Sequence, residues 1–403
     1  MPAPRALAAL GAVSAAIYGA PVALGLAAIP MDAMIVYLMV FPLLFGVYLA
    51  AMRLTFRQPP ASAGLGAPRR AAALTTILAF GLLFRLLMLP TPIFLSSDLD
   101  RYFWDGRVQL AGVNPYRYPP AAPQLAALRD DEFHPSINRP TSRTVYPPGA
   151  QWIFAAAAAA GIRTVLAWRI LLLAAEAVTV ALLLALLRRH RLAEPAIIAY
   201  AWSPLVGFEG VQAGHLDFLM VPLVLLALLW RGEGATIRSG LALGLAVLIK
   251  LYPAVLVLAW SARLDAAKRV GGVGARAWQQ ATVAWWQSRD WRFVGVVAAT
   301  IALGYAPYVH ALGAGALGFL PEYFGPAEDH NIGLRALWTW GLGWTSTLAR
   351  ATVMTLLCLA LLGVLVWIGR PDTTAGLARQ GRLARARTWH WCRRRCTPGT
   401  WSG

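Results

Sequence analysis

Two aspartates one residue apart, Asp98 and Asp100, follow directly on an apolar stretch and open the longest polar segment of the chain. The local sequence from residue 96 to residue 102 is Ser-Ser-Asp-Leu-Asp-Arg-Tyr. A carboxylate beside a low-dielectric region can have a shifted pKa and can take a proton from a hydroxyl group, which is general-base catalysis. The alternative is a solvated helix face on which these acids make local ion pairs with Arg101 or Arg107.

The same polar segment carries two short motifs that break helices and present aromatic rings. They are Gly-Val-Asn-Pro-Tyr at 112–116 and Val-Tyr-Pro-Pro-Gly at 145–149. Tyrosine rings at the headgroup level suit an amphiphilic substrate, and they are equally typical of an interfacial aromatic belt. With the acidic stretch they give the candidate substrate-binding residues of this segment, which are Arg101, Tyr102, Asp105, Asn114, Tyr116 and Tyr146.

A second group of polar residues, Glu209, His215 and Asp217, precedes another apolar stretch. A helix N-terminus favours anions. Asp217 could therefore cap the following helix, and His215 could contact a phosphate bound at the same helix end. A structural histidine is the alternative. A third acidic segment, from Glu322 to Asp329, is interpreted as a solvated loop.

Lys250, in the motif Lys-Leu-Tyr-Pro at 250–253, is one of only two lysines in the chain. An ammonium group in an apolar stretch is costly, so Lys250 is expected to have an anionic partner. A lipid phosphate is one candidate, and extension of the side chain to the membrane surface is the alternative. Arg85 and Glu176, both deep in apolar stretches, are interpreted as a structural pair or as separately satisfied charges.

The elements that must position these residues are membrane helices. Of the 403 residues, 58% are hydrophobic and 13% are charged, which is far more apolar than a soluble domain. A helix that spans a bilayer needs about 20 mostly apolar residues. The predicted spans are 6–29, 34–52, 71–90, 165–187, 218–230, 293–307 and 351–368, with shorter apolar pieces at 195–206 and at 241–260, the latter broken near Tyr252.

The net charge of +18 does not indicate nucleic-acid binding, because the arginines cluster in short loops beside the spans. Basic loops of this kind stay in the cytoplasm. This rule places the N-terminus and the loop at 261–292 inside, and the segment at 91–150 outside. The three cysteines show neither a disulfide framework nor metal-ligand spacing.

Most acidic residues then fall on the outer side of the membrane, although acids contribute little to topology. Twelve of the 18 do so: Asp32, Asp98, Asp100, Asp105, Asp130, Asp131, Glu132, Glu209, Asp217, Glu322, Glu328 and Asp329. This convergence predicts a site at the outer membrane surface.

The order of five motifs over residues 70–340 resembles that of polytopic glycosyltransferases of the GT-C superfamily. The motifs are Asp-Leu-Asp-Arg-Tyr at 98–102, Gly-Val-Asn-Pro-Tyr at 112–116, Tyr-Pro-Pro at 146–148, Gly-His-Leu-Asp at 214–217 and Lys-Leu-Tyr-Pro at 250–253. The chain is most similar to bacterial polyprenyl-phosphate-mannose-dependent mannosyltransferases and, more distantly, to the catalytic subunit of GPI mannosyltransferase I. The resemblance implies an all-α polytopic membrane protein, a bundle of about nine to eleven transmembrane or re-entrant helices with a large outer loop after the third span.

The resemblance also implies an enzyme. It would transfer a hexose, with mannose favoured, from a polyprenyl-phosphate sugar to a lipid-linked or cell-envelope glycan at the outer face of the cell membrane, with inversion. Asp98 or Asp100 would be the general base, and Asp98 is favoured because it is nearer the membrane. The remaining assignments are Lys250, His215 and Arg335 to the donor phosphate, and Glu209, Asp217 and Tyr252 to the substrate.

No cofactor and no nucleic-acid partner are expected. A divalent metal on the Asp-x-Asp pair is the alternative, but a donor with a single phosphate offers no diphosphate to chelate. A different class of protein, a lipid or solute transporter or a non-catalytic membrane scaffold, is kept as the second hypothesis. Transporters tend to show internal repeats and ionisable residues near the bilayer midplane. This chain shows no clear repeat, and most of its acids lie outside.

The membrane glycosyltransferase domain is predicted to cover residues 1–370, with the outer catalytic loop at about 91–150. Residues 371–403 are interpreted as a basic tail on anionic lipid. Translation in a shifted frame is the other interpretation. One choice of codons for residues 396–403 permits His-Pro-Trp-Tyr-Leu-Val-Trp in a second frame, which resembles a motif of related mannosyltransferases. That interpretation predicts further apolar segments downstream in the second frame of the gene.

Overall fold

A computed structural model describes residues 4–26, 33–56, 67–261 and 289–323, together with residues 343, 348, 352, 355 and 356. Within these residues the chain is helical and forms no strand, which confirms the all-α class. The chain forms two compact units, residues 1–253 with 296–323, and residues 254–295 with 324–403. In the described part of the second unit, Arg289 Nη1 donates a hydrogen bond to Ser261 Oγ at 2.7 Å.

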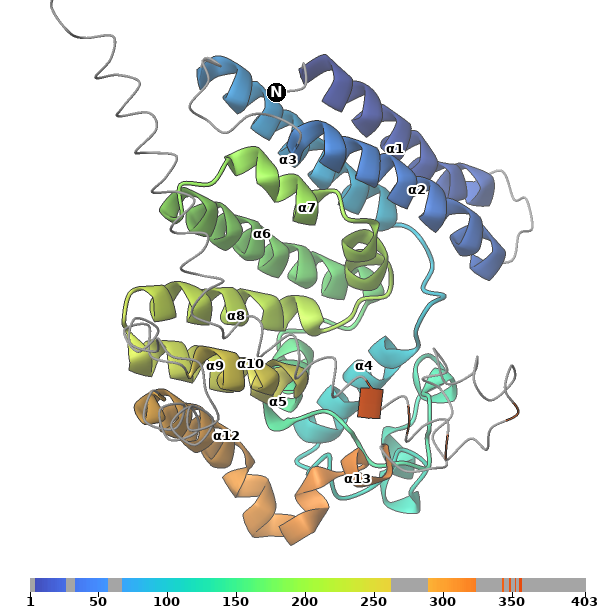
Figure 1. Cartoon of the computed structure of the whole chain (residues 1–403). Helices are drawn as coiled ribbons and strands as arrows, with labels where there is room; N and C mark the ends of the chain where they lie inside the picture. Colours follow the sequence, from blue (N-terminus) through green and yellow to red (C-terminus); the bar gives the residue numbers. More distant parts are fainter. Residues whose placement is uncertain are drawn as a thin grey trace, which may run out of the picture. The chain divides into compact units, whose positions relative to one another are not determined.

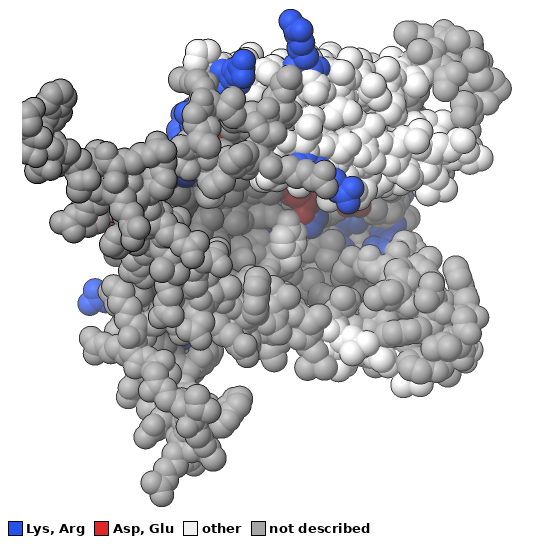
Figure 2. All heavy atoms as spheres, turned by 45° about the horizontal axis from the view of Figure 1, so that its top comes forward, with Lys and Arg blue, Asp and Glu red and all other residues white. Residues whose placement is uncertain are grey.

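Three apolar helices pack together at the N-terminal end of the first unit (Figure 1). They are α1 (Pro4–Leu26), α2 (Ala33–Phe56) and α3 (Ala67–Met88), and α1 contacts the other two. Large apolar side chains of α2, such as Leu38 and Leu43, are exposed. The described surface that comes forward in Figure 2 is largely free of charged side chains. An uncharged apolar surface of this kind suits contact with lipid.

The middle of the first unit is built on α6 (Val165–Arg189), α8 (Asp217–Gly232) and α9 (Thr236–Ile249). α8 packs against both α6 and α9, and the three run side by side in Figure 1. Two shorter helices lie beyond them. α5 (Pro148–Ala159) packs on α9, and α4 (Asp98–Leu110) packs on α5.

Short elements join these helices. The apolar piece predicted at 195–206 forms mainly two short helices, η3 (Glu194–Ile197) and α7 (Ile198–Ala201), followed by the π-helix η4 (Val206–Gln212). The piece at 241–260 is broken where the sequence predicted, because α9 ends at Ile249 and is followed by η5 (Tyr252–Ala254) and α10 (Val255–Trp260).

The predicted outer segment contains η1 (Pro123–Leu128) and η2 (His134–Ser136) besides α4 and the start of α5. Later in the chain come α12 (Trp291–Leu312), η7 (Gly313–Leu317) and α13 (Leu320–Tyr323). α9 packs closely against α12 at Gly244. A Cβ at this position would lie 2.6 Å from Thr300 Cβ, which is too close, so the contact requires glycine.

Four stretches of the described residues are long and apolar enough to cross a membrane. They are Ile35–Phe56, Pro68–Met88, Val165–Arg189 and Trp291–Glu322. The bent pair Val206–Gln212 and Asp217–Gly232 makes a fifth if it counts as one span. More spans than these were expected from the sequence. The additional ones include short helices such as α9. They also include the stretch 351–368, which lies almost entirely outside the described residues.

Arg85 and Glu176 form the structural pair anticipated from the sequence. Nε and Nη2 of Arg85 donate to Oε1 of Glu176 at 2.9 and 2.7 Å, and Nη1 donates to the carbonyls of Gly81 and Ala201. The two side chains are only 5% and 6% exposed. A buried guanidinium with a carboxylate and two carbonyl partners is fully compensated, so this pair joins α3, α6 and α7 and is closed to other ligands.

Candidate active site

α4 begins at Asp98 and places both aspartates in its first turn, where the helix dipole favours negative charge. Ser96 Oγ accepts a hydrogen bond from the backbone N–H of Asp98 at 3.1 Å. Residues two apart on an α-helix point in directions about 200° apart, so the two carboxylates have different surroundings. Asp98 accepts a hydrogen bond from Asn138 Nδ2 at 2.9 Å, whereas Asp100 lines a cavity on another side of the helix.

A tight hairpin between α7 and α8 carries the second predicted group of polar residues. The chain bends by 119° between the π-helix η4 and α8. Gly214 lies in this bend with a φ of +73°, a conformation that favours glycine. Trp168 Nε1, from the first turn of α6, donates to the carbonyl of Gly214 at 2.8 Å. The hairpin is therefore held in place by the beginning of α6.

This hairpin brings His215 to Asp98. Nδ1 of His215 lies 2.9 Å from Oε2 of Glu209, and Nε2 lies 4.0 Å from Oδ2 of Asp98. A histidine with one ring nitrogen on a carboxylate has a fixed orientation, and its other nitrogen is presented to the opposite side. The structure thus joins three predicted residues from two distant segments, with His215 between the two acids.

Lys250 and Asp217 form an ion pair beside this group. Lys250 follows the last residue of α9 in an extended conformation, and its Nζ lies 2.8 Å from Oδ2 of Asp217. Tyr252 donates from its hydroxyl to Oδ1 of Asp217 at 3.1 Å. Both carboxylate oxygens of Asp217 are therefore used by two other predicted residues, and the anionic partner expected for Lys250 is Asp217.

Tyr102 is buried near both acidic clusters, the one formed by Asp98, His215 and Glu209 and the one formed by Asp217, Lys250 and Tyr252. Its side chain is 1% exposed, and its ring stacks on Phe154 at 4.6 Å and meets the ring of Tyr146 edge-on at 5.1 Å. Burial raises the pKa of Tyr102 well above its usual range, and the negative charges of Asp98 and Asp217 raise it further. The buried phenol of Tyr102 therefore stays neutral.

Two of the predicted substrate-binding residues, Arg101 and Asp105, are paired with each other in the α4–α5 packing. Nε of Arg101 lies 2.8 Å from Oδ1 of Asp105, and both side chains are buried. Gln151 on α5 donates to the other oxygen of Asp105, also at 2.8 Å. These contacts attach α4 to α5, and a direct contact of either residue with substrate stays a prediction.

Asn114 and Tyr116 support Tyr146. Oδ1 of Asn114 accepts a hydrogen bond from the N–H of Tyr116 at 3.0 Å, which forms a turn. The buried hydroxyl of Tyr116 then donates to the carbonyl of Tyr146 at 2.7 Å. The two motifs that contain these residues therefore meet, and they position the Tyr146 ring against Tyr102.

Some residues near the site carried no signal in the sequence. Asn138 lies 40 positions after Asp98 in a stretch without a motif, and Trp168 reads as an ordinary membrane-helix residue. Of the third acidic segment, Glu322 is exposed in α13, as expected for a solvated residue. Arg335, Glu328 and Asp329 lie outside the described residues.

Metal coordination was the alternative use of the acidic pair. Within the described ranges, no group of three or more His, Cys, Asp or Glu side chains is arranged to hold a metal ion. The prediction that the reaction requires no cofactor stays a prediction.

The fold defines an all-α polytopic membrane protein with this polar cluster beside its membrane helices. A family model described as alpha-(1->6)-mannopyranosyltransferase, N-terminal domain, matches residues 5–267, and the chain belongs to that family. The match includes the described cluster from Asp98 to Tyr252, confirms the resemblance to mannosyltransferases and establishes mannose transfer as the general activity of the family. No curated protein and no solved structure matches the chain significantly.

The different surroundings of the two aspartates predict a pH effect on stability. Burial, and then the negative charge of Asp130, raise the pKa of Asp100 to about 6. In the unfolded chain an aspartate ionises near pH 4, so the folded form binds the extra proton between about pH 4 and 6 and loses relative stability as the pH rises through that window. Asp100→Asn should therefore raise the unfolding temperature of the detergent-solubilised protein at pH 7 and give little gain at pH 4.

Asp131→Asn is the matched control, because Asp131 is an exposed acid of the same outer segment. Thermal unfolding followed by tryptophan fluorescence at both pH values measures the difference. An equal effect of Asp100→Asn at pH 4 and pH 7 would show that ionisation of Asp100 does not influence folding.

Proposed function

We propose that this protein transfers mannose from a polyprenyl-phosphate donor to a glycan acceptor, at the outer face of the membrane and with inversion, as a GT-C-type enzyme. The observation that carries the proposal is the grouping of Asp98, His215 and the Lys250–Asp217 pair around Tyr102. A base for a hydroxyl and cations for a phosphate are the two requirements of this displacement. Membership of a mannosyltransferase family favours this function over a transporter or a scaffold.

Asp98 is the proposed general base. Its carboxylate is half-buried, receives hydrogen bonds from Asn138 Nδ2 and from the Tyr146 hydroxyl, and keeps lone pairs that can accept a proton from an acceptor hydroxyl. The acceptor oxygen forms its bond to the anomeric carbon while the bond from that carbon to the phosphate oxygen breaks. The hydroxyl proton goes to Asp98, and the polyprenyl phosphate leaves with the electron pair of the broken bond.

Lys250 is the proposed partner of the leaving phosphate. An ammonium group has three N–H donors, and the contact with Asp217 uses one of them. The side chain of Lys250 is 31% exposed, in contrast to the sealed Arg85–Glu176 pair. His215 is proposed as a second contact for the phosphate, since its Nε2 faces the same site. Arg335 keeps its predicted role, outside the described residues.

An apolar groove supports a lipid-linked donor. It has a volume of about 680 Å³ and lies among α5, α6, α8 and α9, where its lining includes Trp152, Leu171, Leu219 and Ile249. Ile249 directly precedes Lys250, and Leu219 follows Asp217 by two positions. A polyprenyl chain in this groove would therefore reach the ion pair with its phosphate, and burial of its methylene groups would favour binding.

The arrangement of charges along α6 and α8 supports an outward-facing site. Both helices begin at the cluster, where Trp168 contacts Gly214, and both end at a group of arginines. There Arg189 pairs with Glu233 at 2.7 Å. Basic ends stay in the cytoplasm, which supports the proposal that the opposite end of these helices, with Asp98 and Lys250, faces outward.

Asp98→Asn is predicted to reduce mannose transfer by about two to four orders of magnitude, which is the usual effect of losing a general base. The measurement uses the purified protein in liposomes, a labelled polyprenyl-phosphate mannose and an octyl α-mannoside acceptor, with GDP-mannose as the competing donor. Donor binding should stay near that of the parent, and Asp131→Asn should transfer normally. Full activity of Asp98→Asn would contradict the assignment of the base, and transfer from GDP-mannose alone would contradict the donor.

Lys250→Met is predicted to weaken binding of polyprenyl-phosphate mannose, because it removes the cation that meets the phosphate while keeping an apolar stem of similar length. Lys268→Met is the matched control, since Lys268 is the only other lysine in the chain and lies in the predicted cytoplasmic loop. Titration of the donor into the solubilised protein measures the affinity. Equal affinity of Lys250→Met and the parent would show that Lys250 serves only its pair with Asp217.

A further inference from the structure

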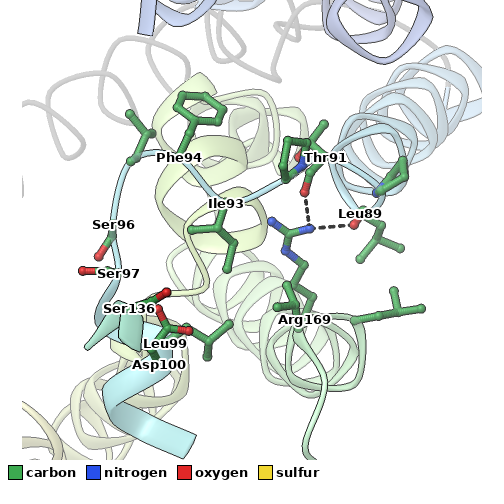
Figure 3. A pocket seen from close by; sticks show the side chains of 15 residues that line it. Leu89, Thr91, Ile93, Phe94, Ser96, Ser97, Leu99, Asp100, Ser136 and Arg169 are labelled. Atoms are coloured by element: carbon green, nitrogen blue, oxygen red, sulfur yellow. Dashed lines mark hydrogen bonds between the residues drawn. The ribbon is translucent and has the colours of Figure 1, made fainter. Parts of the chain in front are cut away.

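A second cavity, of about 970 Å³, lies on the side of α4 that Asp100 faces. It is bounded by the connection between α3 and α4, by the first turns of α4 and α6, and by Ser136 of η2 (Figure 3). Pockets that enclose a drug-sized ligand measure about 300–1,000 Å³, so this cavity is at the upper end of that range. The proposed donor lies in the groove at α5–α9, so it leaves this cavity unused.

The lining of this cavity is divided between polar and apolar side chains. Hydroxyl and carboxylate groups gather on one side in Figure 3, and they belong to Ser96, Ser97, Asp100 and Ser136. The rest of the lining is mainly apolar and includes Ile93, Phe94, Leu95, Val165 and Leu166. A sugar presents hydroxyl groups at its edges and C–H groups on its faces, so a divided lining suits a sugar, whereas the groove at α5–α9 has the apolar lining of a lipid site.

The walls of the cavity are held rigidly. Nη1 of Arg169 donates to the carbonyls of Leu89 and Thr91, both at 2.7 Å, as Figure 3 shows. Nη2 of Arg169 donates to the carbonyl of Gln212, and Nε2 of Gln212 donates to that of Pro92 at 2.6 Å. The segment that lines the cavity is thus attached to the hairpin that carries His215. A cavity with fixed walls is formed before any ligand binds.

The first turn of α4 places this cavity beside the proposed base. Ser97 and Leu99 both line the cavity, and Asp98 lies between them with its carboxylate directed to Asn138 and His215. A ligand in the cavity therefore approaches the base from a different side than a donor held at Lys250. Displacement with inversion requires that the two substrates approach from different sides, because the attacking hydroxyl and the leaving phosphate are on opposite sides of the anomeric carbon.

We propose that this cavity binds the terminal sugars of the acceptor glycan, with Asp100 and the three serines receiving their hydroxyl groups and Phe94 packing against a sugar face. This assignment rests on the proposed function and deepens it. Of the two aspartates, Asp98 then acts in the chemistry and Asp100 binds the acceptor. The ligand is expected to be a neutral saccharide, because the carboxylate of Asp100 disfavours an anion and the Arg169 guanidinium in the wall already bonds three carbonyls.

The test measures acceptor kinetics separately from donor chemistry. The acceptors are octyl glycosides that carry one, two or three α-(1→6)-linked mannoses, and the donor is polyprenyl-phosphate mannose. Asp100→Asn should raise the KM for the two longer acceptors about tenfold or more, the usual effect of losing hydrogen bonds to a charged group. Its kcat at saturating acceptor should fall far less than its kcat/KM, so that most of the loss lies in the acceptor KM. Asp131→Asn should match the parent throughout.

A second variant changes the space in the cavity without changing its charge. Leu166→Trp places a larger ring at the beginning of α6, where Leu166 is 52% exposed and lines the cavity. It should remove the advantage of the longer acceptors over the shortest one while donor hydrolysis continues normally. An unchanged acceptor KM in both variants would overturn the proposal, and so would a fall in the kcat of Asp100→Asn with no change in KM.

These results are distinguishable from failure of the proposed function. If the parent transfers mannose from the polyprenyl donor and Asp98→Asn does not, the function stands whatever the Asp100 variant shows. If the parent shows neither transfer nor hydrolysis with that donor, the proposed function itself is wrong.

Discussion

The hairpin between η4 and α8 is the constraint on which the rest of the site depends. It turns the chain by 119° and places His215 and Asp217 at the beginning of α8, where they face α4 and the end of α9. Its position is fixed by hydrogen bonds from Trp168 and Arg169 in the first turn of α6. Backbone groups that leave a regular helix need such partners, and near a membrane they have few others. The Arg169 bonds also fix the wall of the cavity that is proposed to bind the acceptor.

Two ion pairs of similar length show how burial separates structure from function. Arg85 and Glu176 are 2.7 Å apart and almost fully buried, so they can only join helices. Lys250 and Asp217 are 2.8 Å apart, but their side chains are 31% and 25% exposed. An ammonium that is partly solvated can exchange part of its hydration for a phosphate without breaking its pair. This difference in exposure is the reason why Lys250, and not Arg85, is proposed as the partner of the donor phosphate.

Sequence patterns predicted the long apolar helices and most residues of the polar cluster, but they did not predict the geometry of that cluster. Apolar length predicted α2, α3 and α6, and the polar motifs predicted Asp98, His215, Asp217 and Lys250 as one site. The different roles now proposed for Asp98 and Asp100 depend on where α4 begins, which the acidic motif alone does not determine. Asn138 and Arg169 were not anticipated because their hydrogen-bond partners are distant in sequence. The π-helical form of η4 was not anticipated either, because no sequence pattern distinguishes a π-helix within an apolar stretch.

We propose that donor and acceptor meet at Asp98 from two sides. The most direct test is a structure of the Asp98→Asn variant in a lipid nanodisc with polyprenyl-phosphate mannose bound. We expect the phosphate within hydrogen-bonding distance of Lys250 Nζ, the lipid chain in the groove between α5 and α9, and the anomeric carbon directed to residue 98. A phosphate bound away from Lys250, or a mannose directed away from residue 98, would contradict it.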